Sequence, residues 1–167
     1  MDRIYLHRVN TIERLEGLSG EFGAEIDLRF ANGRIVLSHD PCDDALPFSD
    51  WLKEFRGSGL ILNVKESGLL PFILNELPEK LQSRCILLDQ STPEDYDCGR
   101  ARSMSFFRRL SEYEPLEGVL LWRKYSNLVW LDSFSGAMVT VATLRSLKSL
   151  GFKVCLVSPE LQGFQVD

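Results

Sequence analysis

Short apolar runs that favour β-strands alternate with helix-like segments along the whole chain. Seven such runs lie at residues 4–6, 24–30, 60–64, 85–88, 103–107, 128–131 and 153–157. The segments between them place apolar residues at helical spacing. Because parallel neighbouring strands need a long crossover connection, this alternation favours a parallel sheet covered by helices. The predicted fold class is therefore α/β.

The predicted helices cover residues 48–55, 69–81 and 142–150, with shorter ones opening near Asn10 and at Thr92. Asn10 and Glu13 are spaced as in a capping box, in which a first-turn side chain binds back to the residue that opens the helix. Gly151 follows the last predicted helix at the position where a left-handed residue commonly ends one.

Seven β/α units favour a (β/α) TIM-type barrel over a doubly wound sheet, since polar residues recur along the strands where an inward face is expected. A complete barrel of this type usually needs about 200 residues or more, and this chain has 167. The sequence therefore predicts one domain, 1–167, with an incomplete barrel of about seven units. An eighth strand from residues 118–122 placed out of order, a strand from another subunit, and an open barrel are the alternatives.

An Asn-Gly pair at residues 32–33 interrupts the alternation and predicts a β-hairpin after the second strand. With that turn, the numbers of paired residues sum to 65, so Asp27 opposes Ser38. Regular pairing continued to its end would put His39 on the opposite face from Asp27. Pairing must therefore stop or bulge before His39, and Pro41 favours an early end.

The overall charge of the chain limits its partners. A formal charge of -5 and a pI near 5.1 argue against a broad nucleic-acid surface, which needs clustered basic residues. The amino-terminal residues lack an apolar signal core, and the apolar runs fall short of a membrane span. Four cysteines without a CxxC pair are typical of free thiols. These features predict a cytoplasmic protein.

Two histidines and two carboxylates form the candidate catalytic set. In chain order, with their charged neighbours, the residues are His7, Arg8, Glu25, Asp27, His39 and Asp40. Glu25 and Asp27 share one face of a strand, and buried carboxylates need a compensating cation or hydrogen-bond network. A divalent ion is the usual compensation; a wet hairpin face is the alternative. Such a set suits metal-assisted acid/base chemistry at a phosphate.

These motifs resemble the glycerophosphodiester phosphodiesterase family, within the phosphatidylinositol phospholipase C-like TIM barrels. The matching segments are His7-Arg8 with Asn10-Thr11, then Glu25-Ile26-Asp27, Asn32-Gly33 and His39-Asp40, and finally Leu62-Asn63-Val64-Lys65. The resemblance covers roughly the first 66 residues. Beyond them only the strand and helix rhythm agrees.

The resemblance implies a role for each matched residue. His7 and His39 would be the general acid and base, Glu25 and Asp27 would bind Mg²⁺ or Ca²⁺, and Arg8 would contact the phosphate. In this family the nucleophile is usually a hydroxyl of the substrate's own glycerol. The predicted function is hydrolysis of a small phosphodiester by a phosphoric diester hydrolase.

Two positions depart from the family pattern. Lys65 stands where the family places a third carboxylate ligand, and Glu66 follows it on the opposite strand face. Lys65 could replace the ion as a phosphate-binding cation, leave a weak metal site, or mark lost activity. Val9 stands where a glycine usually follows His-Arg, so the first loop is expected to differ.

Polar residues at other strand ends could line the same barrel mouth. They are Asp89, Arg109, Glu112, Asp132 and Glu160. Arg109 is the predicted substrate-binding residue among them, and Asp132 is the preferred third metal carboxylate. Surface salt bridging is the alternative for each.

Two further hypotheses remain open at this stage. A catalytically inactive barrel could bind phosphate esters at Arg8 and Lys65, or bind a protein partner. An open barrel with unpaired edge strands could also form a homo-oligomer.

Overall fold

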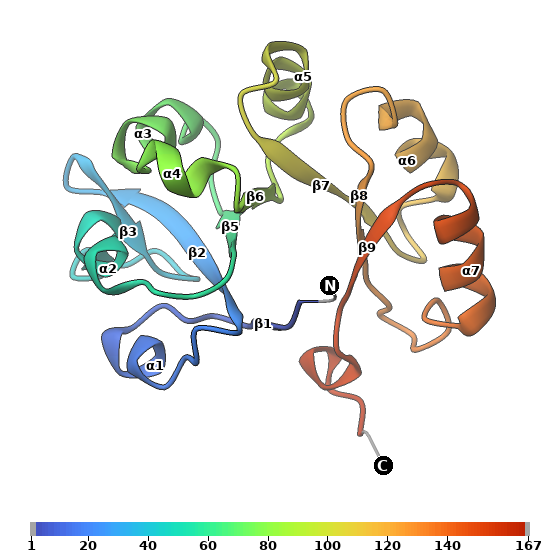
Figure 1. Cartoon of the computed structure of the whole chain (residues 1–167), viewed down its shortest axis with the longest axis horizontal. Helices are drawn as coiled ribbons and strands as arrows, with labels where there is room; N and C mark the ends of the chain where they lie inside the picture. The colour runs from blue at the N-terminus through green and yellow to red at the C-terminus, as the bar shows by residue number, and fades with distance from the viewer. Residues whose placement is uncertain (1–2, 166–167) are drawn as a thin grey trace. The chain divides into compact units, whose positions relative to one another are not determined.

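The computed structural model describes residues 3–165, and the chain forms two compact units. Unit 1 runs to Ser105 and unit 2 begins at Phe106. Each unit contains parallel strands with helices beside them (Figure 1). The single domain predicted over residues 1–167 stays a prediction.

Unit 1 is built around one long strand, β2 (Gly23–Ala31). Its first half pairs in parallel with β1 (Tyr5–Leu6) on one edge and with β5 (Leu60–Val64) on the other, and β5 pairs with β6 (Cys85–Leu88). Its second half forms the predicted hairpin with β3 (Arg34–Leu37), which pairs with β4 (Leu46–Pro47). The register Leu28 to Leu37 confirms the predicted sum of 65.

The helices of unit 1 are α1 (Ile12–Glu16), α2 (Phe48–Glu54), α3 (Leu70–Glu76), α4 (Glu79–Gln82) and α5 (Thr92–Ala101). The single helix predicted over 69–81 is wrong, because Leu77 is extended before Pro78 and the chain restarts as α4. The cap predicted at Asn10 is also wrong. Thr11 is the N-cap, and its side chain accepts the Arg14 N–H.

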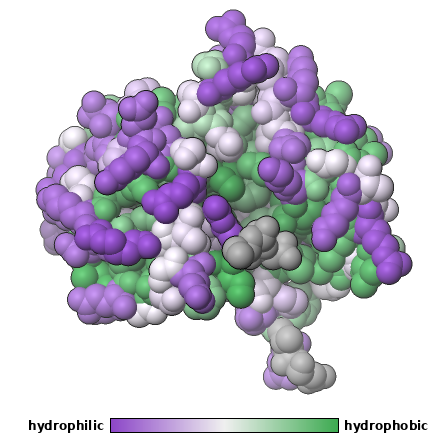
Figure 2. All heavy atoms as spheres, viewed as in Figure 1, coloured by the Kyte–Doolittle hydropathy of each residue, from purple (hydrophilic) through white to green (hydrophobic). Residues whose placement is uncertain are grey.

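The two faces of β2 have different partners. Ile26 and Leu28 are fully buried and belong to the apolar core with Phe48 and Trp51 of α2. The alternate residues of β2 point the other way and carry the polar groups described below. On the face shown in Figure 2, hydrophilic side chains gather over the outer helices of unit 1.

Unit 2 contains three parallel strands in the order β7 (Ser105–Leu110), β8 (Leu128–Leu131) and β9 (Lys153–Leu156). The elements between and after them are α6 (Leu116–Trp122), α7 (Val141–Ser149) and the 3₁₀ helix η1 (Pro159–Gln162). The core contains Leu110, Val119, Val129, Leu131, Leu147 and Phe152.

The eighth strand considered at residues 118–122 is wrong, because this segment is helical. Val119 is buried whereas Leu120 and Leu121 are exposed, which is the one-sided burial of a surface helix. The seven predicted parallel strands are all present among residues 3–165, four in unit 1 and three in unit 2. Within the same residues, the helices are too short or too polar to pass through a bilayer.

Candidate active site

The turn after β1 places His7 and Arg8 beside Glu25. Arg8 has a φ of 53°, in the left-handed region that few residues other than glycine adopt. Its N–H donates to Oε2 of Glu25 at 2.8 Å, and the Val9 N–H donates to the Glu25 carbonyl at 2.9 Å. His7 Nε2 lies 3.8 Å from the same Oε2. Since Arg8 itself carries the positive φ, Val9 can stand where the resemblance expects glycine.

Glu25 and Asp27 are buried, with 2% and 0% of their surface exposed. Asp27 Oδ2 accepts from Asn10 Nδ2 at 2.8 Å, and the Asp27 N–H donates to Asn10 Oδ1 at 3.0 Å. Glu25 Oε1 accepts from Asn63 Nδ2 at 2.8 Å. The alternative of a wet hairpin face is therefore wrong, because both carboxylates lie in the parallel part of β2 and are held by amide donors.

Lys65 supplies a cation to the same pair. Its N–H donates to the Leu28 carbonyl at 3.0 Å, which continues the ladder between β5 and β2. Asn63 is the register partner of Asp27, so Lys65, two residues on, shares its face. Lys65 Nζ lies 3.1 Å from Asp27 Oδ1, and Arg8 Nε lies 3.9 Å from Oδ2.

His39 follows the predicted end of the hairpin ladder. The Ser38 N–H donates to the Asp27 carbonyl at 3.1 Å, and the chain then leaves the sheet. Arg29 shares the strand face of Asp27, and its Nε donates to the His39 carbonyl at 3.0 Å. This bond draws the His39 backbone toward that face. The ring is partly exposed, and its Nδ1 lies 3.0 Å from Asp40 Oδ1, which leaves Nε2 for another partner.

Glu66 binds the far end of β2. Its carboxylate lies 3.8 Å from Arg29 Nη1 and accepts the Phe30 N–H. The Glu66 carboxylate therefore binds groups away from Glu25 and Asp27 and is not part of that pair.

Burial and neighbouring charges shift the pKa values of two groups at the site. Burial, and next the Arg8 guanidinium, lower the pKa of His7 below its usual 6.5. Burial, and next the Asp27 carboxylate, raise the pKa of Glu25 above its usual 4.5. His7 is therefore mostly a neutral imidazole near pH 7, the form that accepts a proton.

The residues present do not fit a divalent metal ion of the type that the resemblance implies. The Lys65 ammonium already compensates Asp27 Oδ1, and both carboxylate oxygens of Glu25 accept hydrogen bonds from N–H groups. Among residues 3–165, no group of three or more His, Cys, Asp or Glu side chains is arranged to hold a metal ion. The carboxylates are instead matched by Lys65 and Arg8.

Solved structures share the fold of this chain. One is a protein from Agrobacterium tumefaciens assigned as a glycerophosphoryl diester phosphodiesterase, with a TM-score of 0.71 and 10% identity over 93% of this chain and 84% of that one. The chain has the fold of the glycerophosphoryl diester phosphodiesterases. A glycerophosphoryl diester phosphodiesterase from Parabacteroides distasonis has a TM-score of 0.64 and 13% identity over 96% and 76% of the two chains.

The sequence itself matches no family model and no curated protein. The shared phosphodiesterase fold confirms the predicted α/β class and the resemblance to TIM-type barrels of this kind. At identities this low the likeness concerns the fold alone. The roles of His7, His39, Glu25, Asp27, Arg8 and Lys65 stay predictions.

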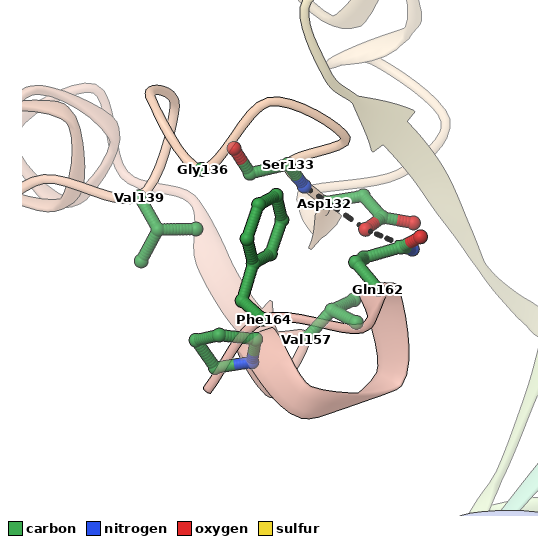
Figure 3. Close-up of a pocket in the computed structure, with 8 residues that line it drawn as sticks. Asp132, Ser133, Gly136, Val139, Val157, Gln162 and Phe164 are labelled. Atoms are coloured by element: carbon green, nitrogen blue, oxygen red, sulfur yellow. Dashed lines mark hydrogen bonds between the residues drawn. The ribbon is translucent and has the colours of Figure 1, made fainter. Parts of the chain in front are cut away.

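Arg109 and Asp132, the other predicted site residues of this phosphodiesterase fold, lie in unit 2 and bind each other. Arg109 Nη1 pairs with Asp132 Oδ2, and Asp132 Oδ1 accepts from the Ser133 N–H at 2.9 Å and from Gln162 Nε2 at 2.8 Å. In Figure 3, dashed lines join Asp132 to the Gln162 amide and to the backbone nitrogen of Ser133. Asp132 thus lies in a hydrogen-bond network, and its role as a metal ligand stays a prediction.

A cavity of about 280 Å³ lies beside Asp132. Its lining residues are Asp132, Ser133, Gly136, Val139, Val157, Pro159, Gln162 and Phe164 (Figure 3). Glu112, on the loop after β7, accepts hydrogen bonds from Ser133 and from the Phe134 and Ser135 N–H groups. Glu112 therefore holds the loop that contributes Ser133 to the cavity lining.

Three residues at the unit 1 site were missed as site residues from the sequence. Asn10 and Asn63 bind the buried carboxylates, and Arg29 positions the His39 backbone. The signal for Asn63 was its place two residues before Lys65 on a buried strand. In the sequence, Asn10 is interpreted as a helix cap and as part of the Asn-Thr match to the family, and neither interpretation gives it a contact with Asp27.

Proposed function

We propose that this protein hydrolyses a small phosphodiester of the glycerophosphodiester type. The observation that carries the proposal is the grouping of His7, Arg8 and Lys65 around the buried carboxylates of Glu25 and Asp27. These side chains supply a proton acceptor and two cations for a phosphate group. The proteins with this fold that are assigned as glycerophosphoryl diester phosphodiesterases support the same substrate class.

In the proposed reaction, a hydroxyl of the substrate's own glycerol attacks the phosphorus in line with the leaving oxygen, and water then opens the cyclic phosphate so formed to complete the hydrolysis. The neutral His7 imidazole takes the proton of the attacking hydroxyl as the new P–O bond forms. The bond to the leaving alkoxide then breaks, and protonated His39 donates a proton to that oxygen through Nε2. Arg8 and Lys65 stabilise the negative charge on the phosphoryl oxygens.

Alanine substitution of each histidine tests this proposal. His7→Ala and His39→Ala should each lower kcat for a chromogenic phosphodiester by about 10²-fold to 10⁴-fold, the usual contribution of a general acid or base. Circular dichroism and thermal unfolding of each variant serve as the folding control. Activity retained in both folded variants would remove the histidines from the mechanism.

A second candidate function is phosphate-ester or protein-partner binding without catalysis. Lys65 at the position of an expected carboxylate ligand favours this candidate, because the change removes part of the metal chemistry that the resemblance implies. A silent binder would take up glycerol phosphate in calorimetry and release no alcohol from a phosphodiester. Turnover by the wild-type protein that depends on His7 would exclude this candidate.

A further inference from the structure

We infer that the ammonium group of Lys65 is the resident cation of the unit 1 site, so that phosphate esters bind there without a divalent metal ion. The choice of phosphate esters as the ligand rests on the proposed function. The assignment of Lys65 as the cation rests on its position beside Asp27.

The first support is the position of Lys65 relative to Asp27. Asp27 Oδ1 is buried and, among residues 3–165, accepts no hydrogen bond of regular geometry. The group beside it is Lys65 Nζ, at 3.1 Å. An unpaired buried carboxylate oxygen is costly, so the ammonium provides the compensation that a bound ion would otherwise supply.

The second support is the charge balance. Glu25 and Asp27 carry two negative charges when ionised, and Lys65 and Arg8 carry two positive charges close to them. The group is therefore formally neutral without any ion. A divalent cation between the carboxylates would lie within a few ångströms of an ammonium, and like charges at that distance repel strongly where little water screens them.

The third support is that the two cations remain accessible to a ligand. The Lys65 side chain is 17% exposed and that of Arg8 is 45% exposed. An ammonium has three N–H donors, so contact with Asp27 leaves donors free for a phosphate oxygen. The His7 ring, 33% exposed, lies on the same Glu25 carboxylate that Arg8 contacts through its backbone. A phosphate ester would thus meet two cations beside an imidazole.

The test combines metal and phosphate titrations on the full chain. Isothermal calorimetry with MgCl₂ or CaCl₂ should show no binding to the wild-type protein, and neither salt should raise its unfolding temperature. Inorganic phosphate should bind in the presence of EDTA. Lys65→Gln should weaken phosphate binding about tenfold or more, as expected for loss of a charged hydrogen bond.

Lys65→Glu should reverse the preference of the site. A third carboxylate on this strand face should bind Mg²⁺ or Ca²⁺, raise the unfolding temperature when either ion is added, and abolish phosphate binding. Lys53→Glu is the matched control, because Lys53 is an exposed lysine on α2 paired with Asp50. Lys53→Glu should change neither titration.

Several results would overturn the inference. They are metal binding by the wild-type protein that Asp27→Asn removes, phosphate binding unchanged in Lys65→Gln, and a folded Lys65→Glu protein that binds neither ion. If Lys65→Glu does not fold, the metal and phosphate titrations of the wild type and of Lys65→Gln still test whether Lys65 is the resident cation. Phosphate binding without metal, combined with no hydrolysis of phosphodiesters, would refute the proposed function and leave the cation assignment standing.

Discussion

Arg8 contributes to the site through both its backbone and its side chain. The left-handed backbone at φ 53° turns its N–H toward Glu25, while its guanidinium lies 3.9 Å from Asp27. A left-handed conformation costs a residue with a Cβ about 1 kcal/mol. That cost persists where the surrounding structure requires it, which is common at functional sites.

Two substitutions at this position separate the two contributions. Arg8→Gly and Arg8→Ala both remove the guanidinium, so both should weaken phosphate binding to a similar extent. Only Arg8→Gly relieves the backbone, so it should be more stable than Arg8→Ala by about 1 kcal/mol. Urea denaturation and phosphate calorimetry on the pair measure the two effects. Equal stability would contradict the strain at residue 8.

At the residue scale, the sequence predicts correctly which side chains share a strand face, because spacing along a strand determines the direction of each side chain. The sequence assigns Glu25 and Asp27 to one strand face because residues two apart must share it, and the structure places both buried carboxylates beside His7, Arg8 and Lys65. Hydrogen-bond partners that are distant in the chain are determined by the register between strands, which the spacing does not give. The bond between Asn63 and Glu25 depends on such a register, so the residue pattern alone could not reveal it.

At the element scale, two adjacent residues between β1 and α1 have different tasks: one binds the buried site and the other caps the helix. Asn10 holds the buried Asp27 through its carboxamide, while Thr11 caps α1. The helix is five residues long and exposed over most of its surface. Its cap therefore has a local effect, whereas the Asn10 side chain supports the site.

Alanine substitution at the two positions should have unequal effects. Thr11→Ala should cost about 1 kcal/mol of unfolding free energy, as for other helix caps, and leave hydrolysis nearly unchanged. Asn10→Ala removes the hydrogen-bond partners of Asp27 Oδ2 and of the Asp27 backbone N–H, at a cost of about 1–3 kcal/mol for each buried group. It should also lower kcat/KM. Chemical denaturation and steady-state kinetics compare the two. Normal kinetics in Asn10→Ala would mean that Asn10 has no positioning role.

The strands were predicted more reliably than the helices. The strands at 85–88 and 128–131 are continuous apolar runs bounded by polar residues, and that signal is strong in a parallel sheet. Helical periodicity continued through Pro78, where the backbone cannot keep α geometry before the proline. Residues 118–122 are uniformly apolar in the sequence, so only their one-sided burial reveals the helix.

At the scale of the whole molecule, the buried Glu25 makes stability depend on pH. Its pKa is raised in the folded state, so the folded protein keeps this proton at pH values where the unfolded chain releases it. The contribution of Glu25 to stability is therefore fully present below pH 4.5 and is lost as pH rises through the folded pKa. The loss is about 1.4 kcal/mol for each unit by which folding raises the pKa.

Glu25→Gln removes this titration and isolates its effect. The difference in unfolding free energy between the variant and the wild type should shift in favour of the variant as pH rises from 4.5 to neutrality. Urea denaturation over that pH range measures it, with Glu16→Gln on the exposed side of α1 as the control. A difference that is constant with pH, or that shifts in favour of the wild type, would contradict the raised pKa of Glu25.

The architecture of the whole chain was predictable because the β/α alternation is visible in the sequence, and the shared phosphodiesterase fold confirms it. The division into two units was not predictable, because no linker or change in composition marks Ser105. Arg109 and Asp132 pair with each other in unit 2. Their mutual contact depends on the register between β7 and β8 and the loops that follow, which spacing along the chain does not specify.

The length of the two-residue turn at Asn32 and Gly33 determines the position of His39 at the other end of the hairpin. Because Ser38 is bonded to Asp27, the number of residues between them determines where His39 leaves the sheet. If one residue added in this turn shifted the pairing by one position, the His39 side chain would move to the other face of the ribbon. The length of this exposed turn is thus constrained by the position that His39 must take at the site, although the turn itself makes no contact there.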